Sequence, residues 1–221
     1  MIVLGIDTST PTTSVALVGD DGRVIAQTSS SARGQAGEIL TLIDGLCTAA
    51  GLRPVDLGAV AVGAGPGLFT GLRIGMATAK GIAFAAGCPL WTVSSLAALA
   101  RGVADGLVIA LIDARRGEYY AGAFRAGVAI AAEAAVPPDR IAHYVAAACH
   151  DDEPVAYVGA EALVASLPNM IARTPSAASV AQLALEGARL DVVATGAPSY
   201  VRPAEAELKY PDGVPGALRK R

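Results

Sequence analysis

Both halves of the chain open with the same pattern: a short apolar strand that ends at an aspartate, then a turn and a hairpin. Residues 2–6 precede Asp7 in the first half, and residues 107–112 precede Asp113 in the second. Apolar runs of this length, bounded by turn residues, are typical of buried strands. The repetition predicts a duplicated α/β unit whose two lobes enclose a cleft, the natural place for a ligand.

The chain is long enough for such a two-lobed architecture. It has 221 residues, 53% of them hydrophobic, which suffices to bury a proper core. We expect an N-terminal lobe at 1–105, with a hairpin, a glycine-rich elbow and partner-binding helices. A smaller C-terminal lobe is expected at 106–221, with its last helix, at 177–190, packing back on the first lobe.

The composition leads us to expect a cytoplasmic protein that does not bind membranes. No uninterrupted apolar run reaches the roughly 18 residues that a membrane span needs, and no basic stretch precedes the first strand as in a signal peptide. Cys47, Cys88 and Cys149 lack metal-site spacing and predict buried thiols in a reducing cytoplasm. A net charge of −3 argues against broad electrostatic capture of nucleic acid by this chain alone.

A glycine-rich elbow connects an apolar strand at 59–62 with a helix predicted at 76–86. It reads Gly63-Ala-Gly-Pro-Gly-Leu-Phe-Thr-Gly-Leu-Arg-Ile-Gly75. Gly65 and Gly67 permit positive φ angles and close approach, and backbone N–H groups converge at such strand–helix turns. The elbow is therefore either a ligand loop or a plain tight turn.

Small residues recur at every fourth position along the helix that follows the elbow. They are Gly71, Gly75, Ala79 and Ala83. Residues four apart share a helix face, and glycine within a helix costs about 1 kcal/mol relative to alanine. The stripe indicates that another backbone comes close, either the chain's own sheet or a partner subunit. The helix at 38–50 offers apolar residues for the same partner surface or for the core. They are Ile39, Leu42, Ile43 and Leu46.

Duplicated lobes with an aspartate after each first strand resemble the actin, sugar-kinase and heat-shock ATPase superfamily, which has a ribonuclease H-like fold. In that superfamily the two aspartates face the nucleotide phosphates across the cleft. The candidate nucleotide or cleft residues are Asp7, Thr8, Gly65, Gly67, Arg73 and Asp113. Both aspartates lack the usual Asp-x-Gly-Thr/Ser form, and Asp7 equally suits a cap of its own turn. Arg73 equally suits a phosphate clamp or a pair with an acidic neighbour.

Four motifs in a fixed order give a closer resemblance, which covers the chain from residue 2 to about residue 203. They are Ile6-Asp-Thr-Ser-Thr10, Gly65-Pro-Gly-Leu-Phe-Thr-Gly-Leu-Arg-Ile-Gly75, Ile112-Asp-Ala-Arg-Arg-Gly-Glu-Tyr-Tyr120 and Pro198-Ser-Tyr-Val-Arg-Pro203. Together they are similar to the TsaB family, whose bacterial members are needed to make threonylcarbamoyladenosine beside the tRNA anticodon. The elbow with its Phe-Thr-Gly-Leu-Arg continuation is the most specific of the four.

The resemblance implies a non-catalytic partner subunit, required for threonylcarbamoylation of the adenosine next to the anticodon in tRNAs that read codons beginning with A. Such a subunit binds and supports a TsaD-type catalytic subunit through its amino-terminal helices, and a TsaE-type ATPase joins the complex, which uses ATP. The chain alone is expected to form a homodimer through the same surface. We expect contact with tRNA only through the complex, no membrane binding and no cofactor of its own.

The catalytic relative, TsaD, carries a metal-binding His-x-x-x-His just after the strand that follows the glycine helix. Here the corresponding residues are Val93-Ser-Ser-Leu-Ala-Ala98, which provide no imidazole or carboxylate for a divalent metal. His143 and His150 lie in the second half, outside any helical i, i+4 pair or protease motif. We therefore predict no metal site, no catalytic residue and no protease activity.

Two other functions remain open. One is a stand-alone nucleotide-dependent phosphotransferase of the sugar-kinase superfamily, which the missing phosphate-loop glycines disfavour. Micromolar nucleotide binding by the chain alone, about −8 kcal/mol, would favour it. The other is a self-associating scaffold, which would dimerise without any effect on tRNA modification.

Overall fold

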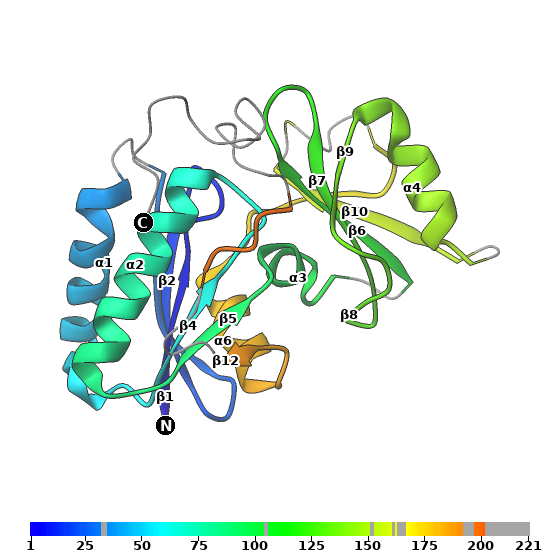
Figure 1. Ribbon diagram of the computed structural model, residues 1–221. Helices are drawn as coiled ribbons and strands as arrows, with labels where there is room; N and C mark the ends of the chain where they lie inside the picture. Colours follow the sequence, from blue (N-terminus) through cyan, green and yellow to red (C-terminus); the bar gives the residue numbers. More distant parts are fainter. Residues whose placement is uncertain are drawn as a thin grey trace, which may run out of the picture.

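The computed structural model describes residues 1–31, 35–103, 106–150, 153–160, 162, 167–191 and 197–201. Within this part of the chain, two mixed β-sheets lie side by side, and helices pack on both (Figure 1). The end of the expected first lobe, residues 104–105, and the last two residues of the motif at 198–203 fall outside the described residues.

The first sheet places the N-terminal strand at its centre. Its spatial order is β12 (Leu190–Asp191), β5 (Leu90–Val93), β4 (Ala59–Gly63), β1 (Ile2–Asp7), β2 (Thr13–Gly19) and β3 (Val24–Ser30). β1, β2 and β3 pair antiparallel, and β4 and β5 continue in parallel on the other side of β1. Leu4 and Ile6 belong to one core cluster and Val3 to another, as expected for a strand covered on both faces.

The second sheet repeats this arrangement. Its order is β11 (Met170–Ala172), β10 (Val155–Gly159), β6 (Leu107–Asp113), β7 (Tyr119–Arg125) and β8 (Val128–Ala129), with β9 (Ala134–Val136) also paired to β7. β6 and β7 pair antiparallel as β1 and β2 do, and β10 and β11 lie parallel to β6 as β4 and β5 lie parallel to β1. The equivalence confirms a duplicated α/β fold of the actin, sugar-kinase and heat-shock ATPase type.

The helices cover the sheets unequally. α1 (Gln35–Ala49) and α2 (Phe69–Ala86) lie side by side on one face of the first sheet, and α6 (Ala177–Leu185) covers the opposite face (Figure 1). The short helix α3 (Ser95–Ala100) packs against α6 and the second sheet, and α4 (Ile141–Ala148) packs on the other face of that sheet. α6 therefore packs on the first sheet although it follows the second in sequence. The described part also contains the 3-10 helices η1 (Pro54–Asp56) and η2 (Pro138–Arg140).

Some boundaries differ from the predicted ones. α2 begins at Phe69 rather than at residue 76, because close packing accommodates early glycines that local propensity disfavours. The predicted strand at 128–136 forms the separate strands β8 and β9. α6 ends at Leu185 rather than at 190, because Gly187 turns the chain away with φ at +95°. α4 is absent from the predicted elements.

Candidate functional site

The turn after β1 encloses the carboxylate of Asp7, which is completely buried. The backbone N–H and hydroxyl of Ser9 donate to Asp7 Oδ1 at 3.0 and 2.7 Å, and the Ser95 hydroxyl donates to Oδ2 at 3.0 Å. Burial raises the pKa of this carboxyl above its ordinary 3.8, although the bonds from Ser9 and Ser95 lower it. Donors within the chain occupy both oxygens, which favours the alternative that Asp7 caps its own turn over a role facing a nucleotide.

The glycine-rich elbow closes over the same turn. Leu68 N–H donates to Ser9 O at 2.7 Å, and the Thr8 hydroxyl donates to Gly71 O at 2.8 Å. A Cβ atom at Gly67 would overlap Ser9, so this glycine is needed for the close approach of two segments of the chain.

Gly65 is enclosed in the same way. A Cβ at Gly65 would come within 2.9 Å of Leu72 Cδ1 and of Ser199 O, and its φ is +111°. Other segments of the chain therefore lie against both glycines, which favours the plain tight turn over the ligand loop, although Gly65 also lines a separate cavity of about 470 Å³. Thr8 is also completely buried beneath α2, so it does not reach the cleft.

Asp113 does reach a cavity between the two sheets. Its carboxylate accepts a bond from Arg115 N–H at 2.7 Å and pairs with the Arg115 guanidinium at 3.2 Å. The cavity measures about 170 Å³ and also has Thr10, Leu111 and Arg173 in its lining. Ligand pockets usually measure ~300–1,000 Å³, so this cavity is small for a nucleotide. Of the expected cleft residues, the structure places Asp113 there and packs the others elsewhere.

The small-residue stripe on α2 faces inward. Gly71, Gly75, Ala79 and Ala83 are all buried, and α2 packs on β4 and β1 through this face. A Cβ atom at Gly75 would overlap the Thr8 hydroxyl. The stripe therefore packs closely against the first lobe of the same chain.

The apolar residues of α1 also belong mainly to the core. Ile39, Ile43 and Leu46 are buried in the cluster between α1, α2 and the sheet, and Leu42 is partly buried against it. Side chains enclosed in this way cannot form a partner surface while the lobe stays folded. Their placement at the interface is corrected: the stripe and the apolar positions of α1 build the lobe.

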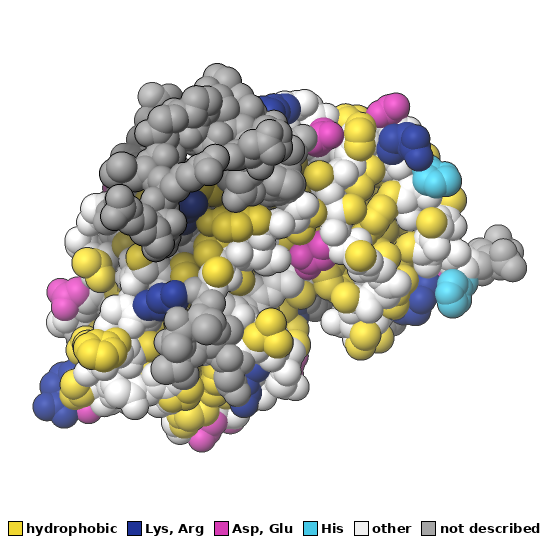
Figure 2. Space-filling view, in the orientation of Figure 1, with side chains coloured by type: hydrophobic (Ala, Val, Ile, Leu, Met, Phe, Trp, Pro, Cys, Tyr) yellow, Lys and Arg dark blue, Asp and Glu magenta, His cyan; other side chains and the backbone are white. Residues whose placement is uncertain are grey.

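A different set of residues forms the exposed side of these helices, which we call the outer helix face. On α1 it consists of Leu40, Thr41, Asp44, Gly45 and Thr48, and on α2 of Thr70, Arg73, Ala77, Gly81 and Phe84. Phe84 is 91% exposed and Leu40 is 59% exposed. A Cβ added at Gly45 or Gly81 would meet nothing within 4 Å. Figure 2 shows hydrophobic, basic and small or polar surface interspersed on the α1 and α2 side.

Arg73 stands at the N-terminal end of this face and not in the cleft. Its guanidinium lies over the Phe69 ring at 3.8 Å from the centroid, and its Nε donates to the Tyr200 hydroxyl at 3.2 Å. The Phe69 and Tyr200 rings are 5.4 Å apart. Sequence reasoning missed Tyr200 as a contact, although the residue lies in the motif at 198–203.

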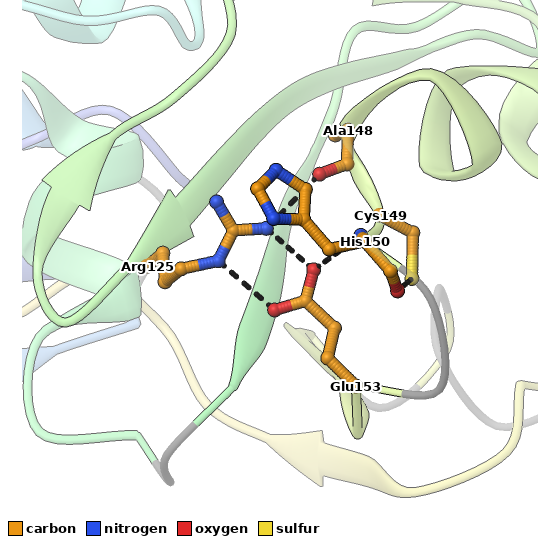
Figure 3. Close-up of polar contacts among 5 residues, drawn as sticks. All are labelled: Arg125, Ala148, Cys149, His150 and Glu153. Carbon is orange, nitrogen blue, oxygen red and sulfur yellow. Dashed lines mark hydrogen bonds and ion pairs between the residues drawn. The ribbon is translucent and has the colours of Figure 1, made fainter.

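A polar cluster in the second lobe joins β7 to the loop after α4 (Figure 3). Arg125 Nε donates to Glu153 Oε2 at 2.9 Å, and Arg125 also donates to Ala148 O at 3.1 Å. The backbone N–H of His150 donates to Glu153 Oε1 at 2.7 Å. Hydrogen bonds, first of all from Arg125, lower the pKa of Glu153 to about 2. The cluster thus holds a loop in place.

Neither a metal-ligand cluster nor a membrane-spanning helix is found in the part of the chain that the structure describes. No three His, Cys, Asp or Glu side chains are grouped so that they could hold a metal ion. None of the described helices is long and apolar enough to cross a bilayer. His143 and His150 are both exposed.

Known proteins resemble this chain over most of its length. The family profile of TsaD, tRNA N6-adenosine threonylcarbamoyltransferase, matches residues 29–210. The tRNA threonylcarbamoyladenosine biosynthesis protein TsaB of Escherichia coli is 42% identical over 124 residues, which span 54% of this chain and about half (53%) of that protein. The TsaB protein of Bacillus subtilis is 29% identical over 227 residues, covering 95% of this chain and 98% of that protein.

A solved structure agrees with these matches. YeaZ from Pseudomonas aeruginosa superposes with a TM-score of 0.75 at 31% identity, covering 90% of this chain and 99% of YeaZ. The strand order, the motifs and these similarities lead to one assignment: the chain belongs to the TsaB family, within the wider group that the TsaD profile describes.

Proposed function

We propose that this chain is a non-catalytic subunit in the synthesis of threonylcarbamoyladenosine in tRNA, and that it acts by binding and supporting a TsaD-type catalytic subunit. The modified adenosine is the one next to the anticodon in tRNAs that read codons beginning with A. Relatives that carry the name of this biosynthesis support the pathway. In this proposal a TsaE-type ATPase joins the complex, which consumes ATP in the cytoplasm, and tRNA is contacted through the complex.

Internal contacts support a non-catalytic role. The place of the metal-binding histidines in the catalytic relative begins here with Ser94 and Ser95. Ser95 is completely buried and donates to Asp7, while Ser94 accepts from Ala97 N–H at 3.1 Å as the N-cap of α3. A hydroxyl group that is held in this way is a poor substitute for the imidazole and carboxylate ligands that divalent metals prefer.

The observation that carries the partner role is the composition of the outer helix face. Phe84 projects from α2 with 91% of its surface exposed, and aromatic residues are enriched at protein–protein interfaces. Gly81 and Ala77 lie on the same side of the helix and leave room for a partner backbone. We propose that helices of the TsaD-type subunit pack here, and that the chain alone pairs with a second copy through the same face.

Reconstituted modification of tRNA tests this proposal. Formation of threonylcarbamoyladenosine is measured with the TsaD-type and TsaE-type subunits from the same source, with and without this chain. We expect modification only when the chain is present, and none from the chain alone. Modification that proceeds equally well without the chain would contradict the proposal.

Two variants locate the surface in the same assay. Gly81→Leu and Phe84→Asp are expected to lower the affinity for the TsaD-type subunit roughly 30-fold or more, as at other interface hot spots. Ala146→Leu, at an exposed position of α4 in the second lobe, is the matched control and should bind normally. If both α2 variants bind like the unmodified chain, the outer helix face is not the interface.

A further inference from the structure

The guanidinium of Arg73 is held in place on the outer helix face. Its central carbon lies 3.8 Å from the centroid of the Phe69 ring, and the Tyr200 hydroxyl accepts its Nε–H at 3.2 Å. An arginine fixed on aromatic rings loses little further conformational freedom when it binds, and its planar fork suits a carboxylate. Among the described residues, no carboxylate pairs with Arg73 and no other hydrogen bond to it is found.

Tyr200 reaches Arg73 from a distant part of the sequence. The two residues are 127 positions apart. Ser199 N–H donates to Ala64 O at 2.7 Å, which fastens the segment 197–201 to the elbow, and the absence of a side chain at Gly65 leaves room for Ser199. The elbow thus positions Tyr200 beside the first turns of α2. A segment from the end of the described chain therefore determines the orientation of an arginine near the middle.

The electrostatics at this end of α2 favour a negative group. The first turn of α2 contains no acidic residue, and Leu68 at the N-cap provides no side-chain acceptor for the helix N–H groups. The N-terminus of a helix carries a partial positive charge, which adds to the charge of Arg73. Toward the C-terminus of α2, the same face continues into Ala77 and Gly81, which present little side chain. A single positive site beside small residues suits a carboxylate on a partner helix that packs along α2. An extended polyanion would need several positive sites in a row.

We propose that Arg73 is the charged anchor of the partner surface and binds an Asp or Glu carboxylate of the TsaD-type subunit. Phe69 and Tyr200 act as positioning residues that hold the guanidinium toward that subunit. This inference rests on the proposed function and names the chemistry of the contact. An arginine paired bidentately with a carboxylate and supported by aromatic rings is a frequent hot spot of protein interfaces.

The test measures the dissociation constant for the purified TsaD-type subunit at several salt concentrations. Arg73→Ala is expected to weaken binding about tenfold or more and to flatten the salt dependence, because a charged contact is lost. Arg73→Lys keeps the charge without the fork, and should retain the salt dependence with reduced affinity. The matched control is Arg23→Ala, which removes another exposed arginine, at the turn between β2 and β3.

Tyr200→Phe tests the positioning role. It removes the hydroxyl that accepts from Arg73 but keeps the ring beside Phe69. We expect about threefold weaker binding in the otherwise unmodified chain and no further loss when Arg73→Ala is already present. A purely structural contribution of Tyr200 would lower the affinity equally in both backgrounds, which would overturn the positioning role. Thermal unfolding of each variant confirms that it is folded.

The outcomes separate this inference from the proposed function. If the unmodified chain fails to bind the TsaD-type subunit, the proposed function fails. If it binds, and Arg73→Ala binds with the same affinity and salt dependence, only the anchor is wrong. If Arg73→Ala weakens assembly only when tRNA is present, the arginine binds phosphate instead, and the assignment to a carboxylate is overturned.

Discussion

The two faces of α2 both carry small residues, but one face packs against the chain and the other is exposed to solvent. The inner face has Gly71, Gly75 and Ala79 against the chain's own first lobe, whereas the outer face has Ala77 and Gly81 open to solvent. Both are small-residue patterns that admit a close neighbour. The lesson is that such a pattern indicates close packing but does not say what packs there.

The two aspartates that follow the first strand of each lobe also differ in burial. Asp7 is completely buried and accepts bonds from Ser9 and Ser95, whereas Asp113 lines a cavity with 43% of its side chain exposed. The duplicated strand and turn therefore give one internal structural carboxylate and one that reaches the space between the sheets.

The largest effect is expected when the inner face is overpacked. A leucine side chain at residue 75 overlaps the Thr8 hydroxyl beneath α2, so Gly75→Leu should lower the free energy of unfolding by about 3 kcal/mol. Urea denaturation of the isolated chain measures the change. The variant is thus expected to lose stability in the isolated chain, before any partner is involved. A stable, fully folded Gly75→Leu would show that the two faces do not differ as described.

The next largest effect concerns the buried carboxylate. Asp7→Ala leaves the donors of Ser9 and Ser95 without their acceptor, and should cost about 2–3 kcal/mol of unfolding free energy. Asp7→Asn keeps one oxygen and carries no charge, so it should stay within about 1 kcal/mol of the unmodified chain.

Asp113→Ala is the matched change in the second lobe. It removes an exposed pair with Arg115 and the hydrogen bond from Arg115 N–H, and should cost about 1 kcal/mol or less. Equal losses for Asp7→Ala and Asp113→Ala in the same denaturation experiment would erase the distinction between the two lobes.

An effect of opposite sign, smaller than that of Asp7→Ala, is expected on the outer face. Gly81→Leu places a good helix former where a Cβ meets nothing within 4 Å, so the isolated chain should gain about 0.8 kcal/mol of unfolding free energy. Thermal and urea unfolding measure the gain, with Gly81→Ala as the control for helix propensity alone. A loss of stability would mean that residue 81 packs against the chain after all.

The smallest effect is a pH dependence in the second lobe. The pKa of Glu153 is lowered from 4.5 to about 2, chiefly by hydrogen bonds from Arg125. A depressed pKa means that the contribution is fully present above about pH 4.5 and is lost as pH falls toward 2. The stability difference between the unmodified chain and Glu153→Gln should therefore be constant near neutrality and shrink in acid. A difference that does not change with pH would show that the ion pair does not stabilise the loop.

Local patterns in the sequence were sufficient for the architecture. Apolar runs that end at Asp7 and Asp113 mark the central strands of both sheets, and the predicted strand at 90–93 has the same bounds as β5. Apolar period and turn residues are properties of neighbouring residues, so one sequence contains them. Weakly patterned segments were missed. The division of residues 128–136 into β8 and β9 depends on pairing with β7, and α4 depends on packing over the second sheet.

The duplicated α/β fold, the family and the closely packed stripe on α2 can all be read from local sequence patterns. The free face of α2, the enclosure of Asp7 and the contact between Tyr200 and Arg73 become known only from the folded chain. Burial and pairing depend on contacts between residues far apart in the chain, which no local pattern contains. A stripe of small residues can pack against the chain's own sheet or against another subunit, and only the folded chain shows which of the two occurs.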